Sequence, residues 1–133
     1  MDLQIFTDGA SRGNPGPAAA AFVFIQEKNL IFENAVFLGE KTNNQAEYQA
    51  IVLALKEAQK FKGSTIILSS DSELVVKQLN GDYQVKDSSL KKLNTDVMKL
   101  CKSFEQVIFV HSPRTDRWIS YTDKLCNKAL NRN

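Results

Sequence analysis

The sequence of 133 residues has no long hydrophobic run and no leader-like start. Its longest apolar stretch, Ala18 to Ile25, has the length of a strand and falls far short of the ~18 residues of a membrane-spanning helix. The first residues, Met1 to Gln4, lack the basic and then apolar pattern of a signal peptide. We therefore expect no membrane association and a cytoplasmic location.

Cysteine and histidine are scarce. The two cysteines, Cys101 and Cys126, form no metal-binding cluster, so we expect free thiols in a reducing compartment. His111 is the only histidine. The formal net charge of +2 permits a polyanionic partner, but it is equally typical of an ordinary solvated surface. Composition therefore leaves the function to be decided by particular motifs.

The order of the hydrophobic patterns predicts an α/β fold. Short apolar or alternating segments indicate five strands, and apolar residues at helical spacing indicate four helices. The strands are expected at Leu3 to Asp8, Ala18 to Gln26, Leu30 to Leu38, Thr65 to Ser70 and Gln106 to His111. The helices are expected at Asn44 to Lys60, Ser72 to Leu79, Ser89 to Cys101 and Ser120 to Leu130.

This order of elements predicts a mixed sheet covered by helices, because a run of hairpins is followed by β-α-β units. Right-handed crossovers place the fourth strand parallel to the first and next to it. The sequence contains no internal repeat, low-complexity tract or linker. We therefore expect a single domain over residues 1–133, and nothing indicates more than a monomer.

Four acidic residues are candidates for chemistry. Asp8 ends the first strand and Asp71 ends the fourth, so if these strands are neighbours both acids lie at the edge where open α/β sheets place their sites. Glu47, in the first turn of the first helix, and Asp123, early in the last helix, are expected to join them. Because converging carboxylates repel one another, they need cations, and hard oxygen ligands suit Mg²⁺ or Mn²⁺.

Each of these acids also has a purely structural explanation. Asp8 suits the start of a turn, and Glu47 fits the third position of a capping box with Asn44. Asp71 fits a helix cap, and Asp123 fits a first-turn acid that complements the helix dipole. Taken singly, Glu47 and Asp123 are better explained in this way than by catalysis.

The residues around the acids resemble the motifs of type 1 ribonucleases H. Residues 7–17 (Thr-Asp-Gly-Ala-Ser-Arg-Gly-Asn-Pro-Gly-Pro) resemble the opening motif, and residues 42–47 (Thr-Asn-Asn-Gln-Ala-Glu) resemble the second, which starts the first helix. Residues 70–72 (Ser-Asp-Ser) resemble the third, and residues 123–129 resemble the fourth, in which an Asp opens the last helix. The four motifs follow the family's order and span nearly the whole chain.

This resemblance implies a ribonuclease H-like fold, with a five-stranded mixed sheet of order 3-2-1-4-5 and helices on both faces. It implies an endoribonuclease that hydrolyses the RNA strand of RNA–DNA hybrids and leaves 5′-phosphate and 3′-hydroxyl ends. Two Mg²⁺ ions, for which Mn²⁺ can substitute, would be held by Asp8, Glu47, Asp71 and Asp123. In the two-metal mechanism that we expect, Asp8 bridges the ions, Glu47 and Asp71 share one, and Asp123 holds the other.

Matching positions imply substrate-binding roles for four polar residues. Asn14, Asn43 and Asn44 would lie in the grooves of the hybrid, and Thr42 would hold a phosphate of the DNA strand. Asparagine side chains both donate and accept, so they can read 2′-hydroxyls and base edges in a shallow minor groove. Turn and capping chemistry explains Asn14 and Asn43 equally well.

Two segments depart from the family pattern. The segment Asp82 to Asp87 is short where some members carry a basic, Trp-rich protrusion, so we expect a lower affinity for the hybrid. The segment before the last helix is the place where many members have a mobile His, and some an Arg, that assists catalysis or product release. Here the candidates for that role are His111, Arg114 and Arg117.

The fourth motif also differs in detail, because Thr122 stands before Asp123 where many relatives have Ala. Asp116 is therefore an alternative fourth acid. Two other classes of function stay open. One is a module of the same fold that binds hybrids without cutting them. The other is an enzyme on the same sheet, such as a 3′→5′ exonuclease or an integrase-like strand transferase, although those enzymes arrange their acids in other local patterns.

Overall fold

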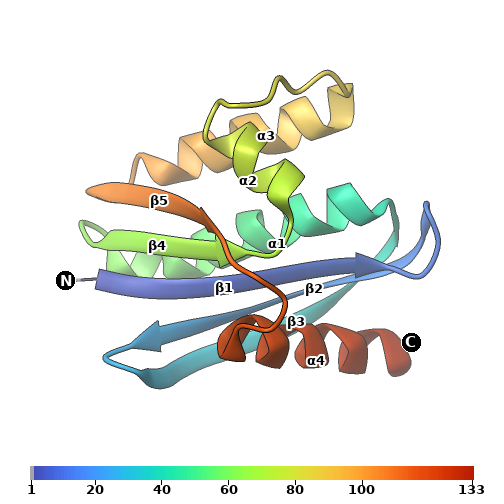
Figure 1. Cartoon of the computed structure of the whole chain (residues 1–133), viewed down its shortest axis with the longest axis horizontal. Helices are drawn as coiled ribbons and strands as arrows, with labels where there is room; N and C mark the ends of the chain where they lie inside the picture. Colours follow the sequence, from blue (N-terminus) through green and yellow to red (C-terminus); the bar gives the residue numbers. More distant parts are fainter. Residues whose placement is uncertain (1) are drawn as a thin grey trace.

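The computed structural model describes residues 2–133 and contains a five-stranded sheet between two layers of helices (Figure 1). The strands are β1 (Asp2–Ser11), β2 (Gly16–Gln26), β3 (Asn29–Lys41), β4 (Thr65–Ser70) and β5 (Gln106–His111). The helices are α1 (Asn43–Glu57), which a 3₁₀ turn continues over Ala58–Phe61, α2 (Glu73–Leu79), α3 (Ser88–Cys101) and α4 (Arg117–Asn131). No helix of the described residues is both long and apolar enough to cross a membrane.

The strand order is β3-β2-β1-β4-β5, which confirms the predicted topology. β1 and β2 pair antiparallel, as do β2 and β3, whereas β4 pairs parallel with both β1 and β5. In this register Phe6 lies beside Ser69, and Ser70 lies beside His111. The β1–β4 ladder stops at Phe6 and Ser69, whereas β1 continues to Ser11, so the prediction that Asp8 ends the first strand is wrong. Asp8 and Asp71 each lie two residues beyond this last pair, which brings them to the same edge of the ladder.

The two faces of the sheet are covered by different helices. The larger core lies between the sheet and α1, α2 and α3, and it contains Leu3 and Ile5 from β1. On the opposite face α4 packs Cys126 and Leu130 against Ala19 and Ala21 of β2. Small side chains at these positions let the helix lie close to the strand. α4 therefore packs on the face of the sheet opposite α1, below β1 and β2 in Figure 1.

The helix boundaries correct two structural explanations offered above. α1 begins at Asn43 because Thr42 caps it, in a capping box formed by Thr42 and Gln45, so Asn44 is not the cap and Glu47 lies in the second turn. Ser72, rather than Asp71, caps α2 by accepting a hydrogen bond from the Val75 N–H. Capping therefore accounts for neither Glu47 nor Asp71.

The last helix begins earlier than its hydrophobic pattern indicated. Asp116 caps α4, because its Oδ1 accepts hydrogen bonds from the N–H groups of Trp118 at 2.9 Å and Ile119 at 3.1 Å. The helix starts at Arg117 instead of Ser120. Asp123 therefore lies in the second turn, and the expectation that it opens the helix is wrong.

Gly9 sets the distance between β1 and α1. A Cβ atom at this position would lie 2.2 Å from the carbonyl carbon of Ala46 and 2.4 Å from the backbone nitrogen of Glu47. Only a residue without a side chain allows the backbones of the strand and the helix to approach so closely. This contact places Glu47 beside the residue that precedes Gly9, which is Asp8.

We predict that Gly9→Ala destabilises the protein by about 2–3 kcal/mol or more, because the added methyl group meets backbone atoms that have no alternative rotamer. Gly39→Ala is the matched control. Gly39 has a φ of +78° but open space around its Cβ position, so its substitution should cost only about 1 kcal/mol of backbone strain. Urea unfolding of the two variants measures the difference, and equal losses would contradict the close contact.

Candidate active site

Three carboxylates from separate parts of the chain lie together just beyond the last β1–β4 pair, Phe6 and Ser69. One oxygen each from Asp8 on β1, Glu47 on α1 and Asp71 after β4 lie within 4.8 Å of one another. Asp8 and Glu47 are buried, with 5% and 6% of their surfaces exposed, and Asp71 is half-buried. Such a group of like charges is unfavourable without a cation.

Hydrogen bonds satisfy this cluster only in part. Glu47 Oε1 accepts a hydrogen bond of 2.9 Å from the Gly9 N–H, which fixes the carboxylate against the strand. Asp8 Oδ2 is buried and has no hydrogen-bond partner among residues 2–133. Because a buried oxygen without a partner is costly, a cation is the natural complement of this position. The all-oxygen donor set fits a hard divalent ion.

Burial and repulsion raise the pKa values of the two buried acids. For Asp8 the largest cause is burial, followed by the charges of Asp71 and Asp123, and together they raise its pKa to about 8. Burial also raises the pKa of Glu47 well above its usual value, and the charges of Asp8 and Asp71 add to this effect. The Gly9 N–H opposes the shift at Glu47. Burial and like charges thus make the charged forms of both acids unfavourable, and a nearby cation would offset this.

Asp123 reaches the cluster from the opposite face of the sheet. It is not within the group of three, but its carboxylate lies beside Asp8 and raises the pKa of Asp8 through its charge and a side-chain hydrogen bond. Asn127, one turn later on α4, donates to Asp123 Oδ2 at 3.4 Å. Asp116, the alternative fourth acid, is used as the cap of α4. The geometry therefore favours Asp123.

Of the three candidate auxiliary residues, Arg114 contacts the acids. Its Nε donates to Asp71 Oδ2 at 3.3 Å, while 83% of its side chain stays exposed. The guanidinium of Arg117 instead lies over the ring of Trp118, 4.7 Å from the ring centroid. His111 is exposed at the end of β5, where it pairs with Ser70. The loop before α4 thus brings one cation to the cluster.

The predicted substrate-binding residues lie in the first loop and at the start of α1. Asn14 Oδ1 accepts a hydrogen bond of 3.1 Å from the Asn43 N–H, and Asn43 Oδ1 accepts one of 3.3 Å from the Ser11 N–H. Both oxygens therefore tie the loop to the helix, and both residues are exposed. Thr42 caps the helix. Asn14 and Asn43 can therefore both hold the first loop against α1 and contact a substrate.

A groove joins the start of α1 to the start of α3. Asn14, Thr42 and Asn44 line a cavity of about 260 Å³ together with Gln45, Asp87, Ser89 and Leu90. The sequence contained a signal for Gln45, because Thr42-x-x-Gln45 has the form of a capping box. It contained none for Ser89, since the Gln45–Ser89 contact joins residues that are 44 positions apart.

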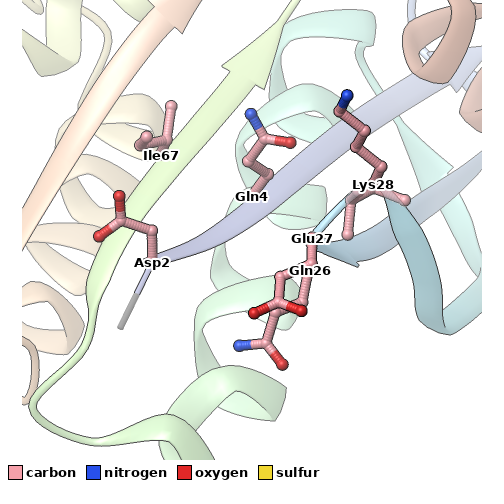
Figure 2. Close-up of a pocket in the computed structure, with 7 residues that line it drawn as sticks. Asp2, Gln4, Gln26, Glu27, Lys28 and Ile67 are labelled. Atoms are coloured by element: carbon pink, nitrogen blue, oxygen red, sulfur yellow. The ribbon is translucent and has the colours of Figure 1, made fainter.

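A larger hollow lies far from the acids. Figure 2 shows this cavity of about 550 Å³, which is lined by Asp2 and Gln4 of β1, Ile67 of β4 and the turn that follows β2. Asp2 and Asp8 are six residues apart on one strand, which corresponds to ~20 Å. The hollow therefore belongs to the opposite end of the sheet and takes no part in the site.

Comparison with known proteins identifies the family. A family model described as "Reverse transcriptase-like" matches residues 6–129. Ribonuclease HI of Halobacterium salinarum is 39% identical over 129 residues, which are 96% of this chain. The crystal structure of ribonuclease H1 from the same organism is 36% identical, covers all of both chains and has a TM-score of 0.94. The chain belongs to the type 1 ribonuclease H family.

A second solved member of the type 1 ribonuclease H family contains a nucleic acid. LC11-RNase H1, in complex with an RNA/DNA hybrid, is 36% identical, with a TM-score of 0.92 over 98% of this chain and 97% of that one. Some relatives are longer. The present chain spans 64% of the Halobacterium ribonuclease HI and 36% of the mycobacterial proteins that it matches. The shared region is the ribonuclease H-like fold itself.

We predict that, in EDTA, the free energy of unfolding of this ribonuclease H-family domain decreases from pH 5 to pH 8. The Asp8→Asn variant should not show this decrease. The pKa of Asp8 is about 8 in the folded state and 3.8 in the reference state, so the folded protein holds a proton that the unfolded chain has released. The contribution of this bound proton to the free energy of unfolding is greatest at low pH, and it is lost as the pH rises toward 8.

The expected change is about 2–4 kcal/mol over this interval, since each pKa unit corresponds to about 1.4 kcal/mol. Urea unfolding at several pH values gives the two profiles. Asp82→Asn, at an exposed acid in the loop after α2, serves as the control and should follow the wild type. Parallel profiles for the wild type and Asp8→Asn would contradict the shift.

Proposed function

We propose that this chain is an endoribonuclease that hydrolyses the RNA strand of RNA–DNA hybrids and leaves 5′-phosphate and 3′-hydroxyl ends. The observation that carries the proposal is the meeting of Asp8, Glu47 and Asp71 within 4.8 Å, with a buried oxygen of Asp8 left unpartnered. Membership of the type 1 ribonuclease H family and the solved relative that holds an RNA/DNA hybrid support this choice of substrate. Residues 1–133 would act as one domain and as a monomer.

The acids would hold two Mg²⁺ ions, or Mn²⁺ in their place. Asp8 would contact both ions, because it is the common neighbour of the Glu47–Asp71 pair and of Asp123. Glu47 and Asp71 would share one ion, and Asp123 would hold the other. When bound, such ions supply an activated water and a charge that stabilises the departing oxygen. The Gly9 N–H keeps Glu47 turned toward this point.

Arg114 would serve as the auxiliary residue of the site. Its contact with Asp71 places a permanent cation at the rim of the acid cluster, on an exposed side chain that is free to change partner. A guanidinium is well suited to meet a phosphate oxygen in a bidentate manner. Arg117 is stacked on Trp118 and His111 lies at the end of β5, so neither is as well placed.

The first loop and the start of α1 would bind the hybrid. The exposed amides of Asn14 and Asn43 can donate to 2′-hydroxyls and base edges, and Asn44 lines the same groove as Asn14. Thr42, which lines that groove, would contact a phosphate of the DNA strand. Contacts of this type read the shape of the hybrid and its 2′-hydroxyls, so we expect little preference for sequence.

We predict that Asp8→Asn lowers the rate of hybrid cleavage roughly 1000-fold, because it removes a ligand shared by both ions and each tenfold corresponds to about 1.4 kcal/mol. The assay uses purified protein with Mg²⁺ or Mn²⁺ and labelled hybrid, duplex DNA and duplex RNA of the same sequence. The wild type should cut the RNA strand of the hybrid internally. Undiminished cleavage by Asp8→Asn would show that Asp8 is not a metal ligand that catalysis requires.

Two further outcomes of this assay separate the alternative functions. A hybrid that is shifted in a gel but stays intact with either metal would indicate a binding module. Cleavage that stops when the 3′ end of the RNA is blocked would indicate an exonuclease. The Asp8→Asn variant should still shift the hybrid when a divalent ion is present, since the loop and helix contacts that bind it are unchanged.

We predict that Arg114→Ala lowers kcat on the hybrid about tenfold, whereas Arg117→Ala changes it less than twofold. The difference follows from the positions of the two guanidiniums, one on Asp71 and the other on Trp118. A loss of one charge-assisted contact of about 1.5 kcal/mol corresponds to this factor. Steady-state kinetics in Mg²⁺ gives both values. The reverse ranking would assign the auxiliary role to Arg117.

A further inference from the structure

The first turn of α3 is joined to the first turn of α1 by a chain of hydrogen bonds. Ser89 Oγ donates to Asp87 Oδ1 at 2.5 Å and accepts from Gln45 Nε2 at 3.1 Å. Asp87 Oδ1 also accepts from the Leu90 N–H at 3.0 Å and thereby caps α3. Leu90 is buried in the main core, so this end of α3 is anchored. Ser89 therefore stands between a fixed helix end and Gln45.

Gln45 links this chain of hydrogen bonds to Thr42 at the start of α1. Its Oε1 accepts a hydrogen bond of 2.9 Å from the Thr42 N–H, and its own N–H donates to Thr42 Oγ1 at 3.2 Å. The oxygen of the Gln45 amide is thus held by Thr42 and the nitrogen by Ser89. Since both ends of the amide are engaged, Thr42 and Ser89 together fix its orientation.

These residues share one groove with the proposed substrate contacts. Gln45, Asp87 and Ser89 line the cavity of about 260 Å³ that also contains Asn14, Thr42 and Asn44. α2 ends at Leu79 and α3 begins at Ser88, so residues 80–87 form the whole connection between them. The start of α3 is the part of this region that borders the groove, and it lies apart from the cluster of Asp8, Glu47 and Asp71.

We propose that Ser89, in the first turn of α3, is a positioning residue for substrate binding. Ser89 acts through Gln45: it orients the amide that holds Thr42, and it thereby keeps the Thr42–Asn44 turn in the arrangement that receives the hybrid. This inference rests on the proposed function. It adds a residue that contributes to hybrid affinity and has no part in the chemical step.

The test compares Ser89→Ala with Ser88→Ala. Ser88 is the adjacent serine in the same helical turn, and its side chain is exposed. Ser89→Ala should raise KM for the hybrid about fivefold and leave kcat unchanged, because one internal hydrogen bond of typical net strength corresponds to roughly a twofold to tenfold change in affinity. Ser88→Ala should leave both values unchanged. Ser89→Thr retains the hydroxyl and should restore KM.

A double-mutant cycle tests the route through Gln45. Gln45→Glu keeps an oxygen for the Thr42 N–H but lacks the N–H that reaches Ser89, so it should also raise KM. Adding Ser89→Ala to Gln45→Glu should then raise KM by less than twofold. The Gln45→Glu variant also supplies the comparison if Ser89→Ala folds poorly.

The outcomes separate this inference from the proposed function. If the wild type cuts no hybrid, both the proposed function and the role of Ser89 are wrong. If the wild type cuts the hybrid and Ser89→Ala has the KM of Ser88→Ala, only the role of Ser89 falls. A loss in kcat with an unchanged KM, or full additivity of Ser89→Ala and Gln45→Glu, would overturn the positioning role as well.

Discussion

At Gly9 the backbone of a central strand touches the backbone of a helix, and the site depends on this contact. The space there is too small for a Cβ atom, and the Gly9 N–H donates to Glu47 across the same gap. The consequence is a Glu from α1 held beside an Asp from β1. The fold thus brings together two charges that would repel one another in water and keeps both nearly free of solvent.

The cost of this arrangement is visible at Asp8. Its carboxylate neighbours Asp71 and Asp123, its Oδ2 has no hydrogen-bond partner in the described chain, and its pKa is raised to about 8. A site built for folding alone would place a donor or an apolar group there. A site built to hold a cation leaves such an oxygen free, and the repulsion among the acids is present in the folded protein without any cation.

Much of this could be predicted from the sequence. The five strands and the place of β4 beside β1 follow from hydrophobic periods and crossover handedness. The full strand order and the grouping of Asp8, Glu47 and Asp71 are what the resemblance to the family's motifs implies. The start of α4 was predicted less well. Its first apolar residues suggested Ser120, whereas a single side chain, Asp116, sets the start at Arg117. Helix caps depend on one or two hydrogen bonds, which weak local preferences do not specify.

By itself the sequence determined the class of fold, the edge at which the acids gather and the family, because each of these follows from patterns within short segments. Only the tertiary structure decided which loop residue meets Asp71 and which serine meets Gln45. Arg114 and Asp71 are 43 positions apart, and Ser89 and Gln45 are 44 apart. Contacts of that separation depend on how helices dock on the sheet, and docking is fixed by the packing of the whole core rather than by neighbours in the chain.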